Sequence, residues 1–200
     1  SGLSIAFTAG LMLAAATWGG AGMRELARAI FPGQVVAFTT SSSLAALPNM
    51  LAGAARLPRL RAETRDVVVP LAASTFKPSV AIVMIVGGCF LGRLYGVPLS
   101  VSQMATLALG ALALSPSLPG IPGGTTILLF APFYSAVGRP LEGIPFLVAI
   151  DTIPDLFRST LNATANVAVA TLVERRVTEP WSRRSVEPKR GVAQTSLTFK

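Results

Sequence analysis

Five polar side chains recur at helical spacing in a segment that is otherwise apolar. Asp151, Asp155, Arg158, Asn162 and Asn166 follow one another at intervals of four, three, four and four residues. On an α-helix these positions lie on one face. Because a charge within a membrane helix costs about 2.5–3.5 kcal/mol on the insertion scale, such residues face protein or water and by default mark a functional site.

The chemistry of this polar stripe suits a small anionic or zwitterionic solute. Arg158 can bind a carboxylate through two parallel hydrogen bonds, and Asp155 can accept hydrogen bonds from an ammonium group. Ser159 lies beside the stripe. The alternative is a packing face, in which Asp155 and Arg158, three residues apart, neutralise each other.

The composition indicates an integral membrane protein. Hydrophobic residues make up 52% of the 200 residues and charged residues 13%, about half the charged share of a soluble domain. The net charge is +8, but aromatic residues make up only 7%. The basic residues cluster at segment ends, so we expect no nucleic acid partner. The sequence contains no histidine and places no base beside Ser41–Ser43, so we expect neither an enzyme nor a metal centre.

The apolar segments predict an all-α integral membrane protein with two re-entrant hairpins. A full span needs about 20 apolar residues, and shorter arms separated by polar residues, proline or glycine are typical of hairpins. The predicted elements are a span over 3–22, a hairpin over 34–55, a span over 67–97 broken at Pro78, a hairpin over 101–137 and a span over 144–173. We also expect this chain, which starts at Ser1 before an apolar run, to be the C-terminal part of a longer protein.

The order of these elements predicts an inverted repeat. A hairpin followed by a broken or polar-faced span occurs twice, and the two hairpins enter from opposite sides of the membrane, which points to a transporter binding site. If the basic residues of 24–28, 56–65 and 175–190 lie on the cytoplasmic side, Arg93 and Arg139 are the only arginines of the segment ends on the opposite side of the membrane. This distribution follows the positive-inside rule. The basic tail over 177–200 is then cytoplasmic, and we expect it to be disordered.

Three motifs resemble one family of transporters. "DTIPDLFRSTLNATAN" resembles the last span of the dicarboxylate/amino acid:cation symporters, which include glutamate transporters and bacterial C4-dicarboxylate carriers. "AFTTSSSLAALPNM" is similar to the serine-rich first hairpin of that family, and "GIPGG" is similar to the tip of its second hairpin. The resemblance covers about residues 3–176, in the family's order.

The resemblance implies secondary active symport of an acidic amino acid or a C4-dicarboxylate by an elevator-type transport domain. It implies a bacterial inner-membrane protein in a lipid bilayer, a small anionic solute as partner, no cofactor, and a homotrimer formed through scaffold spans absent from this chain. Carried over by motif, Asp155 binds the substrate's amino group and Arg158 its side-chain carboxylate. The other implied substrate and gate residues are Ser42, Ser43, Gly120, Ile121, Pro122, Gly123, Thr125, Ser159 and Asn162.

One segment departs from the family pattern. The family's broken span carries N-M-D-G-T, whose Asn and Asp ligate sodium, whereas this chain has Phe76–Val80, without those oxygen ligands. By the resemblance, the cation region comprises Lys77, Asp151, Asn162 and Asn166. We hypothesise that the Lys77 ammonium substitutes for sodium, in which case transport is coupled to protons or uncoupled. The alternative is that Lys77 extends to water at a re-entrant tip.

The sequence leaves two interpretations of the function open. For a transporter, the substrate signal leans to an acidic amino acid, because this chain keeps Asp155, which the dicarboxylate carriers lack. The alternative is a non-transporting pseudo-transporter, a membrane module that retains the fold. The changed segment Phe76–Val80 is the main support for that alternative.

Overall fold

The computed structural model describes residues 1–20, 22–118 and 125–184, and the regular elements in these residues are all helices. This confirms the all-α class. The elements are α1 (Gly2–Trp18), α2 (Met23–Thr40), α3 (Leu47–Ala54), α4 (Ala62–Thr75), α5 (Ser79–Leu94), α6 (Val101–Leu114), η1 (Ser115–Ser117), α7 (Thr125–Leu128), α8 (Ala131–Ala136), η2 (Leu141–Gly143) and α9 (Ile144–Arg184).

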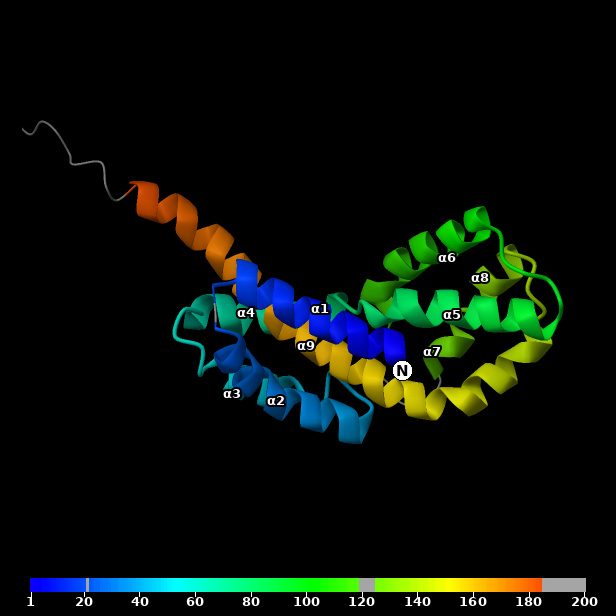
Figure 1. Ribbon diagram of the computed structural model, residues 1–200, viewed down its shortest axis with the longest axis horizontal. Coiled ribbons are helices and arrows are strands. Elements are labelled where there is room, and N and C mark those ends of the chain that lie inside the picture. Colours follow the sequence, from blue (N-terminus) through cyan, green and yellow to red (C-terminus); the bar gives the residue numbers. More distant parts are fainter. Residues whose placement is uncertain (21, 119–124, 185–200) are drawn as a thin grey trace, which may run out of the picture.

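The long helix α9 is the axis on which the other helices are arranged. Figure 1 shows α1–α4 gathered around one end of the molecule and α5–α8 around the other, with α9 running through both groups. α9 packs against α1, α2 and α4, and it also contacts α5 and α7. Each group therefore meets a different part of the same helix.

Two apolar cores correspond to the two groups of helices. The first core includes Leu26 of α2 and Met50 of α3, together with Val167 of α9. The second includes Phe130 and Tyr134, together with Leu147 of α9. Neither core includes a residue of α9 between positions 148 and 163. Most of the polar stripe falls in that interval, so it lies where the two groups of helices meet.

Helices α2 and α3 form a closely packed pair joined by the serine-rich loop. A Cβ atom on Gly53 of α3 would collide with the backbone carbonyl of Ala29 in α2. The two helices therefore approach backbone to backbone at this point, which no larger residue than glycine permits. α2 ends at Ser41, whose φ of 52° lies in the left-handed region, and the chain turns there toward α3.

The chain between α4 and α5 is interrupted at the predicted place. Pro78 has no N–H group and disfavours helix at Lys77. The N–H of Lys77 donates to Ser115 Oγ (3.1 Å), and the N–H of Ser79 donates to Asn162 Oδ1 (3.2 Å). The backbone donors freed by the interruption thus bind η1 and α9, which is how a broken helix is tolerated away from water.

Two predicted boundaries differ from the structure. α2 begins at Met23 rather than near Gln34, because the segment around Arg24 and Arg28 is amphipathic and continues the apolar arm as helix. α9 continues to Arg184, so the first part of the tail predicted as disordered, 177–184, is helical. Residues 185–200 lie outside the described residues.

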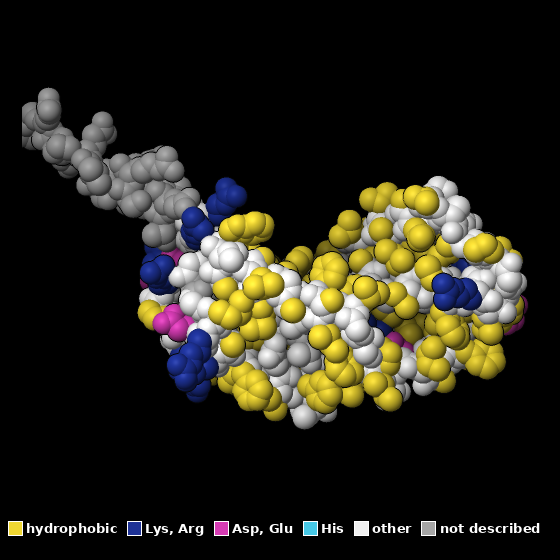
Figure 2. Space-filling view, viewed as in Figure 1, with side chains coloured by type: hydrophobic (Ala, Val, Ile, Leu, Met, Phe, Trp, Pro, Cys, Tyr) yellow, Lys and Arg dark blue, Asp and Glu magenta, His cyan; other side chains and the backbone are white. Residues whose placement is uncertain are grey.

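The apolar character of the surface agrees with a membrane protein. In the part of the chain that the structure describes, one stretch, Ala62–Leu94, is long and apolar enough to cross a membrane, and Gly2–Trp18 and Thr126–Ala136 are shorter apolar helices. Figure 2 shows hydrophobic side chains over much of the face in view, and Lys and Arg side chains mainly at the end that holds α2, α3 and the C-terminal part of α9.

Candidate solute-binding site

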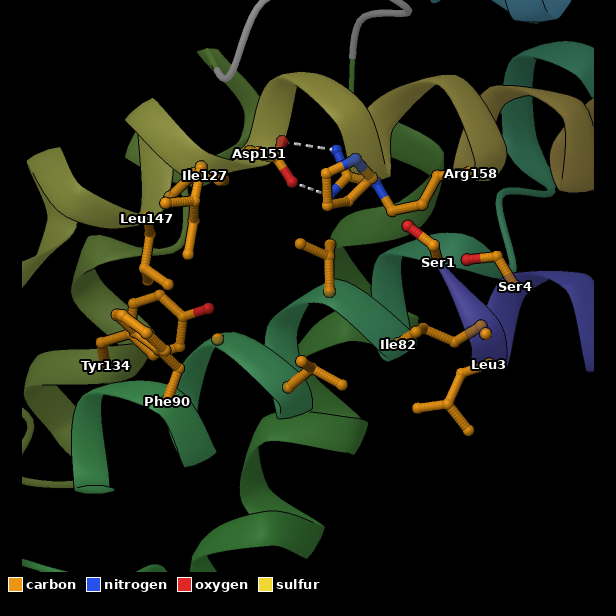
Figure 3. A pocket seen from close by; sticks show the side chains of 16 residues that line it. Ser1, Leu3, Ser4, Ile82, Phe90, Ile127, Tyr134, Leu147, Asp151 and Arg158 are labelled. Atoms are coloured by element: carbon orange, nitrogen blue, oxygen red, sulfur yellow. Dashed lines mark hydrogen bonds and ion pairs between the residues drawn. The ribbon is translucent and has the colours of Figure 1, made fainter. Parts of the chain in front are cut away.

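Arg158 is the centre of a buried ion cluster on α9. Its Nη1 and Nη2 donate to the two carboxylate oxygens of Asp151, with 2.7 Å between Nη2 and Oδ2 (Figure 3). Nη2 also donates to Asp155 Oδ1 at 2.7 Å. The side chains of Arg158 and Asp151 are only 8% and 6% exposed. Two carboxylates thus face one guanidinium, which gives this cluster a formal charge of −1.

The spacing of the stripe predicted part of this cluster. Asp155 and Arg158 pair three residues apart, as the sequence indicated. The pairing of Arg158 with Asp151 was not predicted. Seven residues are about two helical turns, so Asp151 and Arg158 share a face, and only the length of the arginine side chain lets the charged groups meet. The seven-residue spacing on one helix face was the signal from which the Asp151–Arg158 pair could have been predicted.

A small polar cavity lies on the Asp155 side of Arg158. Its free volume is about 40 Å³, which is room for no more than a few water molecules. The α2–α3 loop, the α4–α5 interruption and α9 all contribute to its wall. The predicted site residues that line it are Ser42, Ser43, Lys77, Asp155, Arg158, Ser159 and Asn162. Segments more than 100 positions apart in the sequence are therefore brought to one cavity.

Lys77 contributes a second buried cation to this cavity. The residue is 8% exposed, and its Nζ donates to the backbone carbonyls of Ser74 (2.7 Å) and Leu118 (2.9 Å). The side chain therefore turns inward, and it does not extend to water as the alternative from the sequence supposed. It bridges the end of α4 to the segment that follows η1.

The comparison with known protein families decides what this architecture is. The model of the sodium:dicarboxylate symporter family matches residues 1–176, which is most of the chain. The chain belongs to this family. The family assigned from the three motifs is thereby confirmed.

Individual symporters of this family are similar over a shared region. The chain is 32% identical to the proton/glutamate-aspartate symporter of Escherichia coli over 144 residues, and 29% identical to the proton/sodium-glutamate symport protein of Bacillus caldotenax over 141 residues. Mouse excitatory amino acid transporter 3 is 28% identical over 141 residues. The matches cover 70% of this chain but only 33%, 31% and 27% of the Bacillus, Escherichia and mouse proteins. The chain thus spans about a third of the length of these curated relatives.

Some residues that the family resemblance implicated lie elsewhere or are not described. Ile121 and Gly123, with their neighbours of the predicted gate, lie outside the described residues. Thr125 begins α7, and the next residue, Thr126, lines the polar cavity. Thr126 was missed because the motif ended before it, although it lies in the same polar run.

Asn166 lies deeper along α9 than the rest of the stripe. It is fully buried, and its Nδ2 is 4.0 Å from Met50 Sδ in the first apolar core. Its Oδ1 has no hydrogen-bond partner among the residues that the structure describes. Asn162, by contrast, accepts the N–H of Ser79 and faces the cavity. The structure therefore does not bring Asn166 together with Lys77 in one cavity of the described chain.

A larger cavity of about 320 Å³ lies on the Asp151 side of Arg158. Figure 3 shows Asp151 and Arg158 at one edge of it, with Tyr134, Phe90 and Leu147 across from them and the start of α1 beside them. Its lining is mainly apolar apart from that ion pair. The ion cluster of Asp151, Asp155 and Arg158 thus separates this mainly apolar cavity from the smaller polar one.

Proposed function

We propose that this chain carries the solute-binding part of a secondary active transporter that symports an acidic amino acid or a C4-dicarboxylate. The observation that carries the proposal is the polar cavity in which Arg158, held by two carboxylates, meets the serine-rich loop. The family membership and the names of the relatives, which are symporters of glutamate or of glutamate and aspartate, support the same function. No enzymatic activity is proposed.

Exchange of ionic partners is the proposed binding chemistry. A substrate carboxylate takes the place on Arg158 that Asp155 now occupies. The planar guanidinium then holds this substrate carboxylate through two hydrogen bonds. Asp155, released from Arg158, accepts the substrate's ammonium group. The remaining polar contacts come from the loop and from α9, namely Ser42, Ser43, Ser159 and Asn162.

Binding requires the cavity to open. A free volume of about 40 Å³ is too small for an amino acid. The two arms of the second predicted hairpin, α6 with η1 on one side and α7 with α8 on the other, are here called the second helix pair, and they line the cavity through Leu118, which follows η1, and Thr126 of α7. We propose that residues Ile121, Gly123 and Thr125 belong to a gate that moves with this pair, and that the whole unit moves as an elevator.

The membrane arrangement is part of the proposal. The predicted spans over 3–22, 67–97 and 144–173 and the re-entrant hairpins over 34–55 and 101–137 form an inverted repeat within a lipid bilayer. Support comes from the close α2–α3 pair, from the α4–α5 interruption and from the arginines gathered at one end (Figure 2). The C-terminal tail over 177–200 is then cytoplasmic, the membrane a bacterial inner membrane, and the assembly a homotrimer through spans outside this chain.

A second candidate is a pseudo-transporter that keeps the fold and does not transport. The replacement of N-M-D-G-T by Phe76–Val80 favours it, because the usual sodium ligands are missing there. The same change makes coupling to protons or uncoupled transport the alternatives to sodium symport.

Uptake by proteoliposomes tests the proposed function. The full-length protein is reconstituted, and uptake of labelled L-aspartate and succinate is measured with a sodium gradient, with a proton gradient and without a gradient. We expect saturable uptake that is lost in the Arg158→Ala variant. Absence of both uptake and binding of both solutes contradicts the proposal and supports the pseudo-transporter.

A further inference from the structure

The Lys77 ammonium occupies a position with the chemistry of a cation site. Its two acceptors, Ser74 O and Leu118 O, are backbone carbonyl oxygens from segments 44 positions apart. Carbonyl oxygens are typical ligands of hard metal cations. Among the described residues, Lys77 forms no ion pair with a carboxylate. In the described part of the chain, the positive charge is therefore held by the dipoles of two backbone carbonyls, the kind of ligand that also binds a metal ion.

The position of this charge matters for closure of the polar cavity. Ser74 belongs to the last turn of α4, and Leu118 follows η1 in the second helix pair. Lys77 and Leu118 both line the cavity that contains Asp155 and Arg158. A cation at this point thus connects the fixed interruption of α4–α5 to the element that covers the cavity.

A free sodium ion does not fit at the same point. The ammonium already donates to both carbonyl oxygens, at 2.7 and 2.9 Å. Ser115 Oγ of η1 accepts the backbone N–H of Lys77. The oxygens that a sodium ion needs are therefore bound by a residue of the chain itself.

We propose that Lys77 is a built-in cation that replaces a co-transported ion at this point and keeps the second helix pair docked on the α4–α5 interruption. The proposal rests on the proposed solute-binding function and specifies its ion dependence. The solute then binds without sodium, because the charge and the link that a dissociable ion supplies are covalently present. Loss of the ammonium frees two carbonyl oxygens, which an ion from solution can bind.

Sodium itself is the probe that tests the proposal. The full-length protein is purified, and its thermal unfolding is compared in sodium chloride and in choline chloride of equal ionic strength. We expect no difference for the wild type. For Lys77→Met, whose side chain is similar in length and uncharged, we expect a lower melting temperature in choline that sodium raises by several degrees.

Solute affinity provides the second measurement. We expect the wild type to bind L-aspartate with affinities that agree within about twofold in the two salts. We expect Lys77→Met to bind at least about tenfold more weakly in choline and to recover affinity in sodium. Lys77→Arg keeps a cation and remains indifferent to sodium. Arg93→Met, which removes an exposed cation at the far end of α5, is the matched control and behaves as the wild type.

The outcomes separate this proposal from the proposed function. Two results overturn the proposal that Lys77 is a built-in cation. One is a wild-type affinity for L-aspartate that rises tenfold or more in sodium. The other is a Lys77→Met variant whose melting temperature and affinity sodium does not raise. If Lys77→Met does not fold, sodium dependence of the wild type or of Lys77→Arg overturns it. Failure of the wild type to bind aspartate or succinate in either salt contradicts the proposed function, and the melting temperatures still decide the role of Lys77.

Discussion

Two buried cations line one cavity, and their charges are balanced in different ways. Arg158 on α9 donates to the carboxylates of Asp151 and Asp155. Lys77, at the α4–α5 interruption, donates to the neutral carbonyls of Ser74 and Leu118. A carboxylate of a solute can take the place of a carboxylate partner on a guanidinium, because both groups offer the same acceptor oxygens. The neutral carbonyl partners of Lys77 offer no such exchange. Under the proposed function, Arg158 therefore changes partners and Lys77 stays in place.

This difference assigns separate tasks to the two cations. The two aspartates and the two cations together carry no net charge, since Asp151 and Asp155 give −2 and Arg158 and Lys77 give +2. Without the ammonium, the remaining three charged groups (Asp151, Asp155 and Arg158) would together carry −1, which disfavours an anionic solute beside them. Under the proposed function, Arg158 selects the solute by the geometry of its guanidinium, and the charge of Lys77 offsets the negative charge beside the solute.

The largest expected effect is the loss of the arginine fork. Arg158→Lys keeps the charge but cannot form two parallel bonds to a carboxylate. We expect the affinity for L-aspartate and for succinate to fall at least about 100-fold, in the range of about 2–5 kcal/mol found when a buried, hydrogen-bonded charge pair is truncated. Equilibrium binding of both solutes measures this.

A second buried arginine supplies the control for that substitution. Arg139 is also buried, and its donors bind backbone carbonyls of Val137 and Val97, away from the polar cavity. Arg139→Lys is expected to leave the affinity for both solutes within about twofold of the wild type. Equal losses of affinity in Arg158→Lys and Arg139→Lys would mean that Arg158 affects binding only through the stability of the fold. That result would contradict a role of Arg158 in holding the solute.

Asp155→Asn sharpens the comparison by separating the two classes of solute. If Asp155 accepts the ammonium group of an amino acid, the variant binds L-aspartate about 10- to 100-fold more weakly, because a charge-assisted hydrogen bond is lost. Succinate has no ammonium group, so its affinity changes by less than about threefold. Competition binding gives both values in one series.

Asp151→Asn is the matched variant on the other side of Arg158. Asp151 orients the guanidinium and does not line the polar cavity. We expect it to weaken the binding of aspartate and succinate alike, by about tenfold. A selective loss of aspartate in Asp151→Asn, with none in Asp155→Asn, would exchange the roles of the two carboxylates.

A smaller effect is expected where the chain supports Lys77. Ser115 Oγ accepts the N–H of Lys77 at 3.1 Å, and Ser115→Ala removes that acceptor in a partly buried place. We expect a loss of about 1 kcal/mol in unfolding free energy and about a threefold loss of affinity for both solutes. Thermal unfolding and binding assays measure these changes, and a selective loss of one solute would contradict the structural role.

The smallest effect on solute binding is expected for an ion pair outside the cavity. Glu174 of α9 is buried, and it accepts hydrogen bonds from Arg61 Nε at 2.6 Å and from the Arg61 backbone N–H at 3.3 Å. Glu174→Gln is expected to cost about 1–2 kcal/mol of stability and to leave the binding of both solutes unchanged within about twofold. A large effect on binding would show that charges far from the cavity contribute to it.

The sequence predicted the local features of the site better than its long-range contacts. The stripe on α9 and the interruption at Pro78 follow from helical periodicity and from the lack of a proline N–H, which are local properties. The contact between Lys77 and Leu118 depends on how the second helix pair folds back onto α4, and no local rule gives that distance. The start of α2 was predicted too far along the chain, near Gln34, because the charged residues in the first turns of α2 have the low hydropathy of a loop.

The most direct test of the two cation roles is a crystal structure of the full-length protein with L-aspartate, grown in a thallium salt, because the monovalent thallium ion scatters anomalously. We expect a substrate carboxylate on the Arg158 guanidinium, the substrate ammonium beside Asp155, and the Lys77 ammonium between the carbonyls of Ser74 and Leu118 without a thallium peak there. A thallium ion between those carbonyls with Lys77 displaced, or aspartate bound away from Arg158, would contradict these roles.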